Sequence, residues 1–512
     1  MRKILNKIFS NNFFKEVTRN KDKNVLCVDR ARVKQTLVMC FYVQLVSKKY
    51  NYNPIILSDS IDIKSINLFK KFGLNKFLVG FRYYLFFINT LMFLKSLILT
   101  IKTLYLIKKN GRDWFVYKFR FSNIKIGDLV HDYYIRFGNG YLKNTIDIKF
   151  INILFKAIFR TLNISKIIKN KNIKYIVVGT ETYSHNDAIA LRLGLDKKIT
   201  VIEPSLLLFF IKHTKNSIAN GKFNLSGNKG VRSMKDLSKI DKFLKKRFTG
   251  KIQTKYTGTH LLIKTNKKSK YITRSNFLKK NNFDNKKIKK IILFSCHALT
   301  DANHALGTNF LFLDYYNHLK ETLEFVNEIN NPNVLWVVRP NPSTFDPNEY
   351  KIIQSLVKKF NNKKIITAPK NMMSYNLTNI CDNVITGRGT VGMEFACLGK
   401  YPITVGSSVY SRSGFCLEFS NKKKYFKQLV NIEKIGKLSN EKKLFAKQFL
   451  YYLDNKWDRF IDENTSTIKE KKLHKSAKFI ADWLLLAKNL NGDINNFDFK
   501  NNQFVNYLSE KI

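Results

Sequence analysis

The chain has 512 residues, 44% of them hydrophobic, so it is long enough to bury more than one core and its length favours about two to four domains. Lys and Arg number 91 against 37 Asp and Glu, which gives a net charge of +54, but 74 of the cations are Lys and they are spread over the whole chain. Proteins that read nucleic acid concentrate Arg and aromatic residues in a recognisable module, and the sequence holds none, so we exclude nucleic acid and expect affinity for anionic surfaces.

The N-terminal half alternates between short apolar runs and segments of helical periodicity. The predicted strands lie at residues 24–28, 54–57, 174–178 and 199–203, and the predicted helices include 33–48 and 185–193, the latter ended by Gly194. This alternation is typical of a parallel sheet with helices on both faces. It predicts a first α/β domain at residues 1–205.

Residues 83–107 form an apolar run that is long enough to cross a bilayer. Lys95 and Lys102 interrupt it, and a charge near the centre of a span is costly. We therefore favour helices that are buried or lie on an anionic membrane surface over a true span. The predicted location is cytoplasmic, peripheral at the inner face of the cytoplasmic membrane.

The second half of the chain begins with a region, residues 206–285, in which Lys, Asn, Ser and Gly dominate, and we interpret it as a linker with insertions. A second α/β domain is predicted at residues 286–435, followed by a helical tail at 436–512. The predicted strands of this domain are 291–295, 334–338, 364–367, 384–386 and 401–405, and the predicted helices are 315–329, 349–360 and 391–398, the last capped by Gly399.

Three strands of the second domain are followed by polar residues. In chain order these residues are His297, Asp301, Arg339, Asn341, Gly387, Arg388, Gly389 and Thr390. Because the carboxyl ends of parallel strands open onto one edge of a sheet, we predict that these residues lie together and bind a ligand there.

The turn around Arg388 predicts a phosphate site. Two glycines let backbone N–H groups approach a ligand closely, the following helix N-terminus favours an anion, and Arg388 adds a planar fork of donors. Glu394, one turn into that helix, is predicted either to bind ribose or sugar hydroxyls or to complement the helix dipole. The alternative is an ordinary strand–helix junction, which any α/β protein contains.

The first domain holds two groups of residues that can act as a base. Asp128 and Asp132 fall on one face if residues 127–136 are helical, and a carboxylate there can take the proton of an acceptor hydroxyl. The alternative is a solvated Asp132–Arg136 pair, worth only about 0.3–0.5 kcal/mol. We favour Asp128, since Gly127 suggests a close approach at the start of the helix.

The second group in the first domain follows strand 174–178. Glu181 and His185 lie at that strand end, where they can line the acceptor side. Asp187 is predicted to be an acid in the first turn of the next helix.

The pattern of metal-binding residues is weak throughout. The six cysteines are scattered and form no C-x-x-C pair, so we expect buried free thiols. His297 and His304 lack a third ligand at a usual spacing, and the sequence has no D-x-D pair. We predict no metal and no cofactor, with cations and helix dipoles stabilising a bound phosphate group.

Several motifs carry a family resemblance. HALTDANH at residues 297–304, RPNPS at 339–343 and TGRGTVGMEFACLGKYPI at 386–403 resemble the bacterial capsule and surface polysaccharide biosynthesis family, whose members are similar to GT-B glycosyltransferases. The resemblance covers residues 287–420 well and the N-terminal half weakly. It implies two doubly wound Rossmann-like domains facing a cleft. In relatives a His-Pro pair contacts the nucleotide phosphate. Here the pair is Asn341-Pro342, and because Asn carries no charge, Arg339 and Arg388 are expected to stabilise the phosphate.

The resemblance implies a glycosyltransferase that moves a sugar from a nucleotide-activated donor onto a glycan or lipid-linked glycan acceptor at the membrane. Two alternatives remain open. One is a non-catalytic component of polysaccharide assembly or export, and the other is a glycerol- or ribitol-phosphate transferase. A donor-using enzyme is stabilised by some nucleotide, whereas a binding component is not.

Overall fold

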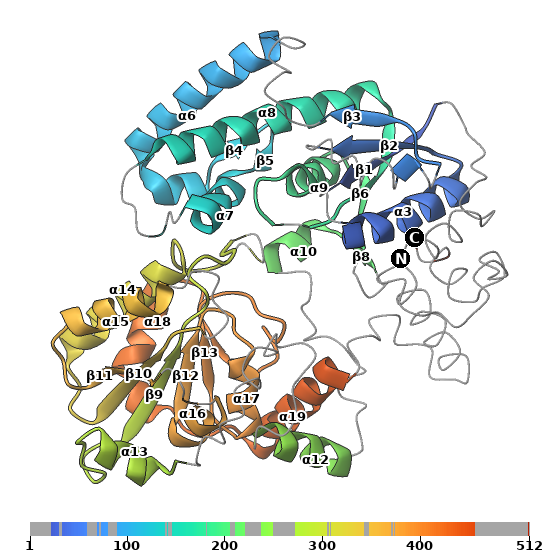
Figure 1. Cartoon of the computed structure of the whole chain (residues 1–512). Coiled ribbons are helices and arrows are strands. Elements are labelled where there is room, and N and C mark those ends of the chain that lie inside the picture. Colours follow the sequence, from blue (N-terminus) through green and yellow to red (C-terminus); the bar gives the residue numbers. More distant parts are fainter. Residues whose placement is uncertain are drawn as a thin grey trace. The chain divides into compact units, whose positions relative to one another are not determined.

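The computed structural model describes residues 22–29, 33–58, 69–70, 73–79, 90–138, 141, 146–180, 182–204, 210–220, 237–248, 272–304, 307, 309–341, 348–369, 372, 374–455, 510 and 512. The chain forms two compact units (Figure 1), and each is described by itself. The first comprises residues 1–134, 145–218 and 460–512, and the second comprises residues 135–144 and 219–459.

The first unit is built on a six-stranded sheet of order β3-β2-β1-β6-β7-β8, in which β8 pairs antiparallel with β7 and the other neighbours are parallel. Its elements are β1 (Asn24–Asp29), α3 (Val33–Tyr50), β2 (Asn53–Ser58), β3 (Phe77–Val79), α6 (Thr90–Tyr117), β4 (Arg120–Phe121), β5 (Ile124–Lys125), α7 (Gly127–Gly138), α8 (Ile148–Asn170), β6 (Ile173–Val177), α9 (Asn186–Asp196), β7 (Thr200–Pro204), β8 (Phe210–Lys212) and α10 (Lys215–Asn220). Two of these helices extend past the bounds of the unit, α7 beyond residue 134 and α10 beyond residue 218.

The second unit is built on a six-stranded sheet of order β11-β10-β9-β12-β13-β14, in which all neighbours are parallel. Its elements are α12 (Leu237–Phe248), α13 (Arg274–Lys280), β9 (Lys290–Ser295), α14 (Tyr315–Ile329), β10 (Val334–Arg339), α15 (Glu349–Lys359), β11 (Ile365–Thr367), α16 (Ser374–Ile380), β12 (Asn383–Thr386), α17 (Val391–Cys397), β13 (Pro402–Thr404), β14 (Leu417–Glu418), α18 (Lys422–Val430), η3 (Ile432–Lys434) and α19 (Asn440–Asn455).

Both sheets have the same topology. If the strands of each sheet are counted along the chain, both orders read 3-2-1-4-5-6, which is the Rossmann arrangement. The predicted α/β class with two Rossmann-like sheets is therefore confirmed. In each sheet the strand order reverses between the first and fourth strands, which are β1 and β6 in the first unit and β9 and β12 in the second. Ligands of such sheets bind outside the carboxyl ends of the strands at this switch point.

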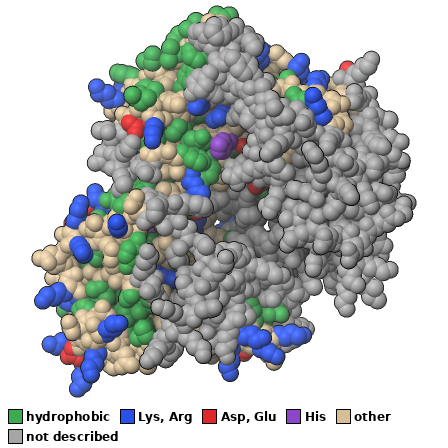
Figure 2. All heavy atoms as spheres, in the orientation of Figure 1, with side chains coloured by type: hydrophobic (Ala, Val, Ile, Leu, Met, Phe, Trp, Pro, Cys, Tyr) green, Lys and Arg blue, Asp and Glu red, His purple; other side chains and the backbone are tan. Residues whose placement is uncertain are grey.

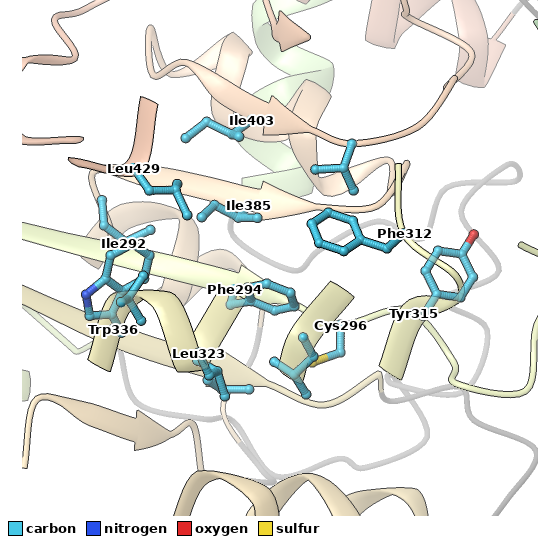
Figure 3. Close-up of a cluster of buried hydrophobic side chains, with 14 of the residues drawn as sticks. Ile292, Phe294, Cys296, Phe312, Tyr315, Leu323, Trp336, Ile385, Ile403 and Leu429 are labelled. Carbon is cyan, nitrogen blue, oxygen red and sulfur yellow. The ribbon is translucent and has the colours of Figure 1, made fainter. Parts of the chain in front are cut away.

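Helices cover both faces of the second sheet, as the residues of β9 show. Ile292 and Phe294 belong to one buried cluster with Phe312 and Tyr315, drawn in Figure 3. Ile291 and Leu293, which alternate with them, belong to a second cluster. Successive strand residues point to opposite faces, so β9 is apolar throughout because both of its faces are buried.

One predicted helix end agrees with the structure, one differs from it, and one helix lies where a linker was predicted. Gly399 ends α17 as predicted, with a positive φ of 80°. Gly194 does not end α9, which continues to Asp196; a Cβ at Gly194 would lie 2.7 Å from Val201 Cγ2, so this glycine lets the helix pack closely on the sheet. Helix α12 lies within the predicted linker and buries Ile240, Phe243 and Leu244.

Candidate functional site

The three polar strand ends of the second unit lie side by side. Ser295, the last residue of β9, is paired in register with Arg339 at the end of β10 and with Thr386 at the end of β12. The loops that follow these residues therefore begin at the same edge of the sheet, at the switch point between β9 and β12. The convergence predicted from the sequence is present.

His297 and the Arg388 turn are in direct contact. The backbone N–H of Arg388 donates to His297 Nε2 at 3.1 Å, and the imidazole stacks on the ring of Tyr315, with centroids 4.4 Å apart. An Nε2 that accepts a hydrogen bond must be unprotonated, so the ring is neutral and carries its proton on Nδ1. Burial, with a smaller effect of the Arg388 cation, accordingly lowers the pKa of His297 to about 3.

The guanidinium of Arg388 turns partly inward. Nη2 donates to Asn303 O at 2.6 Å and lies 3.4 Å from Gly307 O, and the group lies over the ring of Phe310. Its Nε and Nη1 are buried and have no acceptor among the residues that the structure describes. An unsatisfied buried donor costs about 1–3 kcal/mol, and more for a charged group, so these two N–H groups favour an anionic acceptor.

The two glycines of the turn serve a different purpose from the predicted one. A Cβ at Gly387 would lie 2.7 Å from Tyr315 Cε1, and one at Gly389 would lie 2.7 Å from Thr386 Oγ1. The amide of Gly389 donates to that same Thr386 hydroxyl at 3.2 Å. The N–H groups of Arg388 and Gly389 are thus taken by the protein itself, and the glycines permit this packing rather than the approach of a ligand.

Tyr410 holds the same turn from the other side. Its hydroxyl donates to Gly389 O at 2.7 Å, and a Cβ at Gly392 would lie 2.1 Å from that hydroxyl. The side chain is fully buried, and burial raises the pKa of Tyr410 well above its usual value. Tyr410 was not singled out from the sequence, since nothing near it in the chain points to the turn 21 residues earlier.

Other predicted residues also line this edge. Arg339, Asn341, Thr390 and Asp301 are all partly exposed. Burial lowers the pKa of Arg339, opposed by the Glu394 carboxylate. Burial likewise raises the pKa of Asp301, whose Oδ1 accepts from the Ala302 amide at 2.9 Å. Pro342, the partner of Asn341 in the predicted phosphate-contacting pair, lies outside the described residues.

Glu394 and His304 have partners within the second unit. Glu394 forms an ion pair with Arg247 of α12, and both side chains are largely buried. This ion pair differs from both roles that were predicted for Glu394, which were to bind ribose or sugar hydroxyls or to complement the helix dipole. His304 is buried and its Nε2 bonds Leu313 O at 2.7 Å, so it holds the loop rather than a ligand. Thr390 begins α17 without a capping bond from its hydroxyl.

The lowered pKa of His297 predicts a pH dependence of stability. Its folded pKa of about 3 lies below the ordinary value of 6.5, so the contribution of the neutral ring is complete above pH 6.5 and is lost as the pH falls toward 3. We expect His297→Gln to reduce the slope of unfolding free energy against pH in this window by up to about 1.36 kcal/mol per unit. Chemical denaturation between pH 4 and pH 7 measures this slope. Parallel curves for the two proteins would show that the ring has the same pKa in the folded and unfolded chain.

In the first unit Asp128 is not available as a base. Its side chain is fully buried, and Arg192 donates to both carboxylate oxygens, at 2.6 and 2.9 Å. Lys125 lies 3.7 Å away. The close approach predicted at Gly127 is present, since a Cβ there would lie 1.8 Å from Phe115 O. The preference for Asp128 as the base does not fit this environment, because its lone pairs are committed to a buried ion pair.

Asp132 is also fully buried, so the alternative of a solvated Asp132–Arg136 pair is wrong as well.

His185 is partly exposed and precedes α9, where its ring lies 5.0 Å from that of Tyr133. It stands in the loop after β6, at the switch point of the first sheet. Asp187 lies in the first turn of α9, as predicted. Glu181 lies outside the described residues.

All six cysteines are free, and all but Cys416 are buried. Within the part of the chain that the structure describes, no group of three or more His, Cys, Asp or Glu residues is arranged to hold a metal ion.

No family model and no curated protein matches the chain. Among solved structures it is similar to the KpsC β-Kdo 2,4-transferase of Thermosulfurimonas dismutans, with 12% identity over 54% of this chain and 80% of that one and a TM-score of 0.28. A glycosyltransferase from Rickettsia africae ESF-5 has 12% identity, covers 96% and 97% of the two chains, and gives a TM-score of 0.23. The UDP-GlcNAc 2-epimerase of Neisseria meningitidis bound to UDP-GlcNAc has 11% identity over 84% of this chain and 98% of that one, with a TM-score of 0.25. These likenesses are distant.

Proposed function

We propose that the chain is a glycosyltransferase that moves a sugar from a nucleotide-activated donor onto a growing capsular or other cell-surface polysaccharide. Three findings support this. The second unit has a Rossmann-like sheet whose switch point is lined by His297, Arg339 and Arg388. Arg388 presents buried cationic donors that lack an acceptor among the described residues. The motifs at residues 297–304, 339–343 and 386–403 resemble those of surface polysaccharide enzymes.

The donor's phosphates are the proposed acceptors for these cations. In the transfer, the acceptor hydroxyl oxygen attacks the anomeric carbon, the bond from that carbon to the phosphate oxygen breaks, and its electron pair leaves with the nucleotide. Arg388 and Arg339 stabilise the negative charge that develops on the phosphate. His297 is neutral, so it adds one hydrogen-bond donor, its Nδ1–H group, but no positive charge.

We propose that the acceptor's proton goes to His185 or Glu181, which follow β6 in the sequence; Glu181 lies outside the described residues. His185 is partly exposed, whereas both Asp128 and Asp132 are fully buried. A base must come within hydrogen-bond reach of the hydroxyl that it deprotonates, so the exposure of its side chain favours His185 over Asp128 and Asp132.

The observation that carries the proposal is the pair of buried Arg388 donors, Nε and Nη1, at the sheet's switch point. The structural arginines Arg192 and Arg247 each have one buried nitrogen, Nε, without an acceptor among the described residues, whereas Arg388 lacks acceptors at both Nε and Nη1. Arg388 satisfies only one end of its fork.

Mass spectrometry of a transfer reaction tests the proposal. The full chain is incubated with lipid-linked or membrane-derived glycan and, in turn, each common CMP-, UDP-, GDP- and CDP-activated donor. We expect one donor to give a product heavier by one sugar residue, with release of its nucleotide. A product heavier by a phosphoalcohol would replace the proposal with a glycerol- or ribitol-phosphate transferase. Binding of glycan without nucleotide binding or product would favour an assembly component.

A further inference from the structure

Helix α6 has its polar face inside and its apolar face outside. Ser96, Thr100 and Thr103 are buried, and each hydroxyl bonds the carbonyl four residues earlier, at 2.7 Å. The helix packs along α8, where the rings of Phe93 and Phe155 lie 5.0 Å apart. This is the reverse of the usual order for a helix on the surface of a protein in water.

The outer face of α6 is a continuous apolar stripe. Its residues are spaced three or four apart, which places them on one side of the helix, and between 47% and 82% of each is exposed: Leu91, Leu94, Ile98, Ile101 and Tyr105. Figure 2 shows hydrophobic side chains gathered along the upper edge of the molecule, over α6. We call these five residues the α6 stripe. An exposed apolar surface of this kind marks a binding face.

The charges around the α6 stripe indicate its partner. Lys95, Lys102 and Lys109 are exposed and recur every seven residues, so they form a row along one flank. Residues 90–111 contain no Asp or Glu. A helix that combines a wide apolar face with lysines beside it lies in the plane of an anionic bilayer surface, where the aliphatic stems follow the apolar face and the ammonium groups reach the headgroups.

Two other arrangements fit the charges less well. A second copy packed stripe to stripe would bring rows of lysines together, with no acid in residues 90–111 to pair them. Among the described residues, α6 is the one helix long and apolar enough to span a membrane. A span would place Lys102 near the middle of the bilayer and detach the helix from α8, both of which are costly.

We propose that the α6 stripe inserts into the surface of an anionic phospholipid leaflet and holds the protein there as a peripheral membrane protein. This surface belongs to the first unit, whereas the proposed nucleotide site belongs to the second. Its loss is therefore measured without reference to transfer activity.

Vesicle flotation with the full chain tests the proposal, using phosphatidylcholine vesicles with and without phosphatidylglycerol. We expect binding to the anionic vesicles, and we expect Ile98→Glu to weaken it by about tenfold or more, since it replaces an inserted side chain by a charge. Val430→Glu on α18 is the matched control, because Val430 is also an exposed aliphatic residue. It should leave binding unchanged within about twofold.

The lysine row has its own matched pair of variants. Lys95→Glu with Lys102→Glu should weaken binding to anionic vesicles far more than Lys358→Glu with Lys359→Glu, which makes the same change of charge on the exposed end of α15. Equal losses would show that only the overall charge of the chain attracts it, and would overturn the proposal.

A third variant reports the position of the helix directly. Ile98→Trp should emit at shorter wavelength with anionic vesicles and be quenched by brominated lipid, whereas Val430→Trp should show neither effect. Three results would contradict the proposal: equal behaviour of these two variants, a dimer that Ile98→Glu dissociates in the absence of lipid binding, or retention in the pellet after carbonate extraction. The last would identify a true span.

Discussion

Asp128→Asn is expected to lower the free energy of unfolding by about 3–5 kcal/mol, because it leaves the Arg192 guanidinium buried without its counter-charge. The carboxylate is fully buried and accepts two hydrogen bonds from Arg192, and the Leu129 amide also donates to it, at 2.9 Å. Denaturant unfolding, followed by circular dichroism, measures the loss.

Two further variants make the Asp128 result specific. Glu324→Gln removes a half-exposed pair with Lys320 and should cost at most about 0.5 kcal/mol. Replacing Asp128 and Arg192 together by Leu and Met should recover much of the loss, since no buried charge then stays unpaired. If Asp128→Asn kept full stability but abolished transfer, the carboxylate would be the base after all.

Arg388→Ala is expected to weaken nucleotide binding by about 1.5–3 kcal/mol, which is about a 10- to 150-fold rise in Kd. From the sequence alone we predict a much smaller effect on folding. The structure changes this expectation, since the same guanidinium also donates to Asn303 O. A loss of stability of about 1–3 kcal/mol is therefore expected as well.

The control for Arg388 is Arg274→Ala. Arg274 pairs with Asp382 and donates to backbone carbonyls just before β9, at the end of the sheet opposite to the site. It should lower stability without changing nucleotide affinity. Isothermal titration calorimetry compares the two variants at a temperature where both are folded. An unchanged Kd for Arg388→Ala would remove Arg388 from the phosphate site.

The sheet and its edge were predictable from the sequence because local patterns determine them. The β-branched and apolar runs of β9, β10 and β12 mark strands buried on both faces, and their parallel pairing follows from the helices between them. Once the strands are parallel, His297, Arg339 and Arg388 must begin at one edge. No long-range information was needed for this step.

The contacts inside the site were not predictable in the same way. The Arg388 amide meets His297 across 91 residues of sequence, and the Gly389 carbonyl meets Tyr410 across 21. A glycine-rich turn has the same sequence whether its N–H groups face a ligand or a neighbouring side chain. The burial of Asp128 was not predictable for the same reason. The sequence shows which helix face carries Asp128, but not that Arg192, 64 residues away, pairs with it.

One sequence signal was present but was not used. Ile240, Phe243 and Leu244 of α12 have the three- and four-residue spacing of a buried helix face, although lysines dominate the segment around them. On α6 the apolar residues were recognised, but which face turns outward depends on packing against α8. Composition alone cannot show that the Ser and Thr side is buried.

Hydrogen–deuterium exchange of the full chain, with and without the nucleotide donors, tests the central claim most directly. If the switch point of the second sheet binds the nucleotide, one donor should slow exchange in the loops that follow β9, β10 and β12, around His297, Arg339 and Arg388. The protection should disappear in Arg388→Ala and persist in Arg274→Ala. Protection by a nucleotide elsewhere in the chain, with these three loops unchanged, would contradict the account.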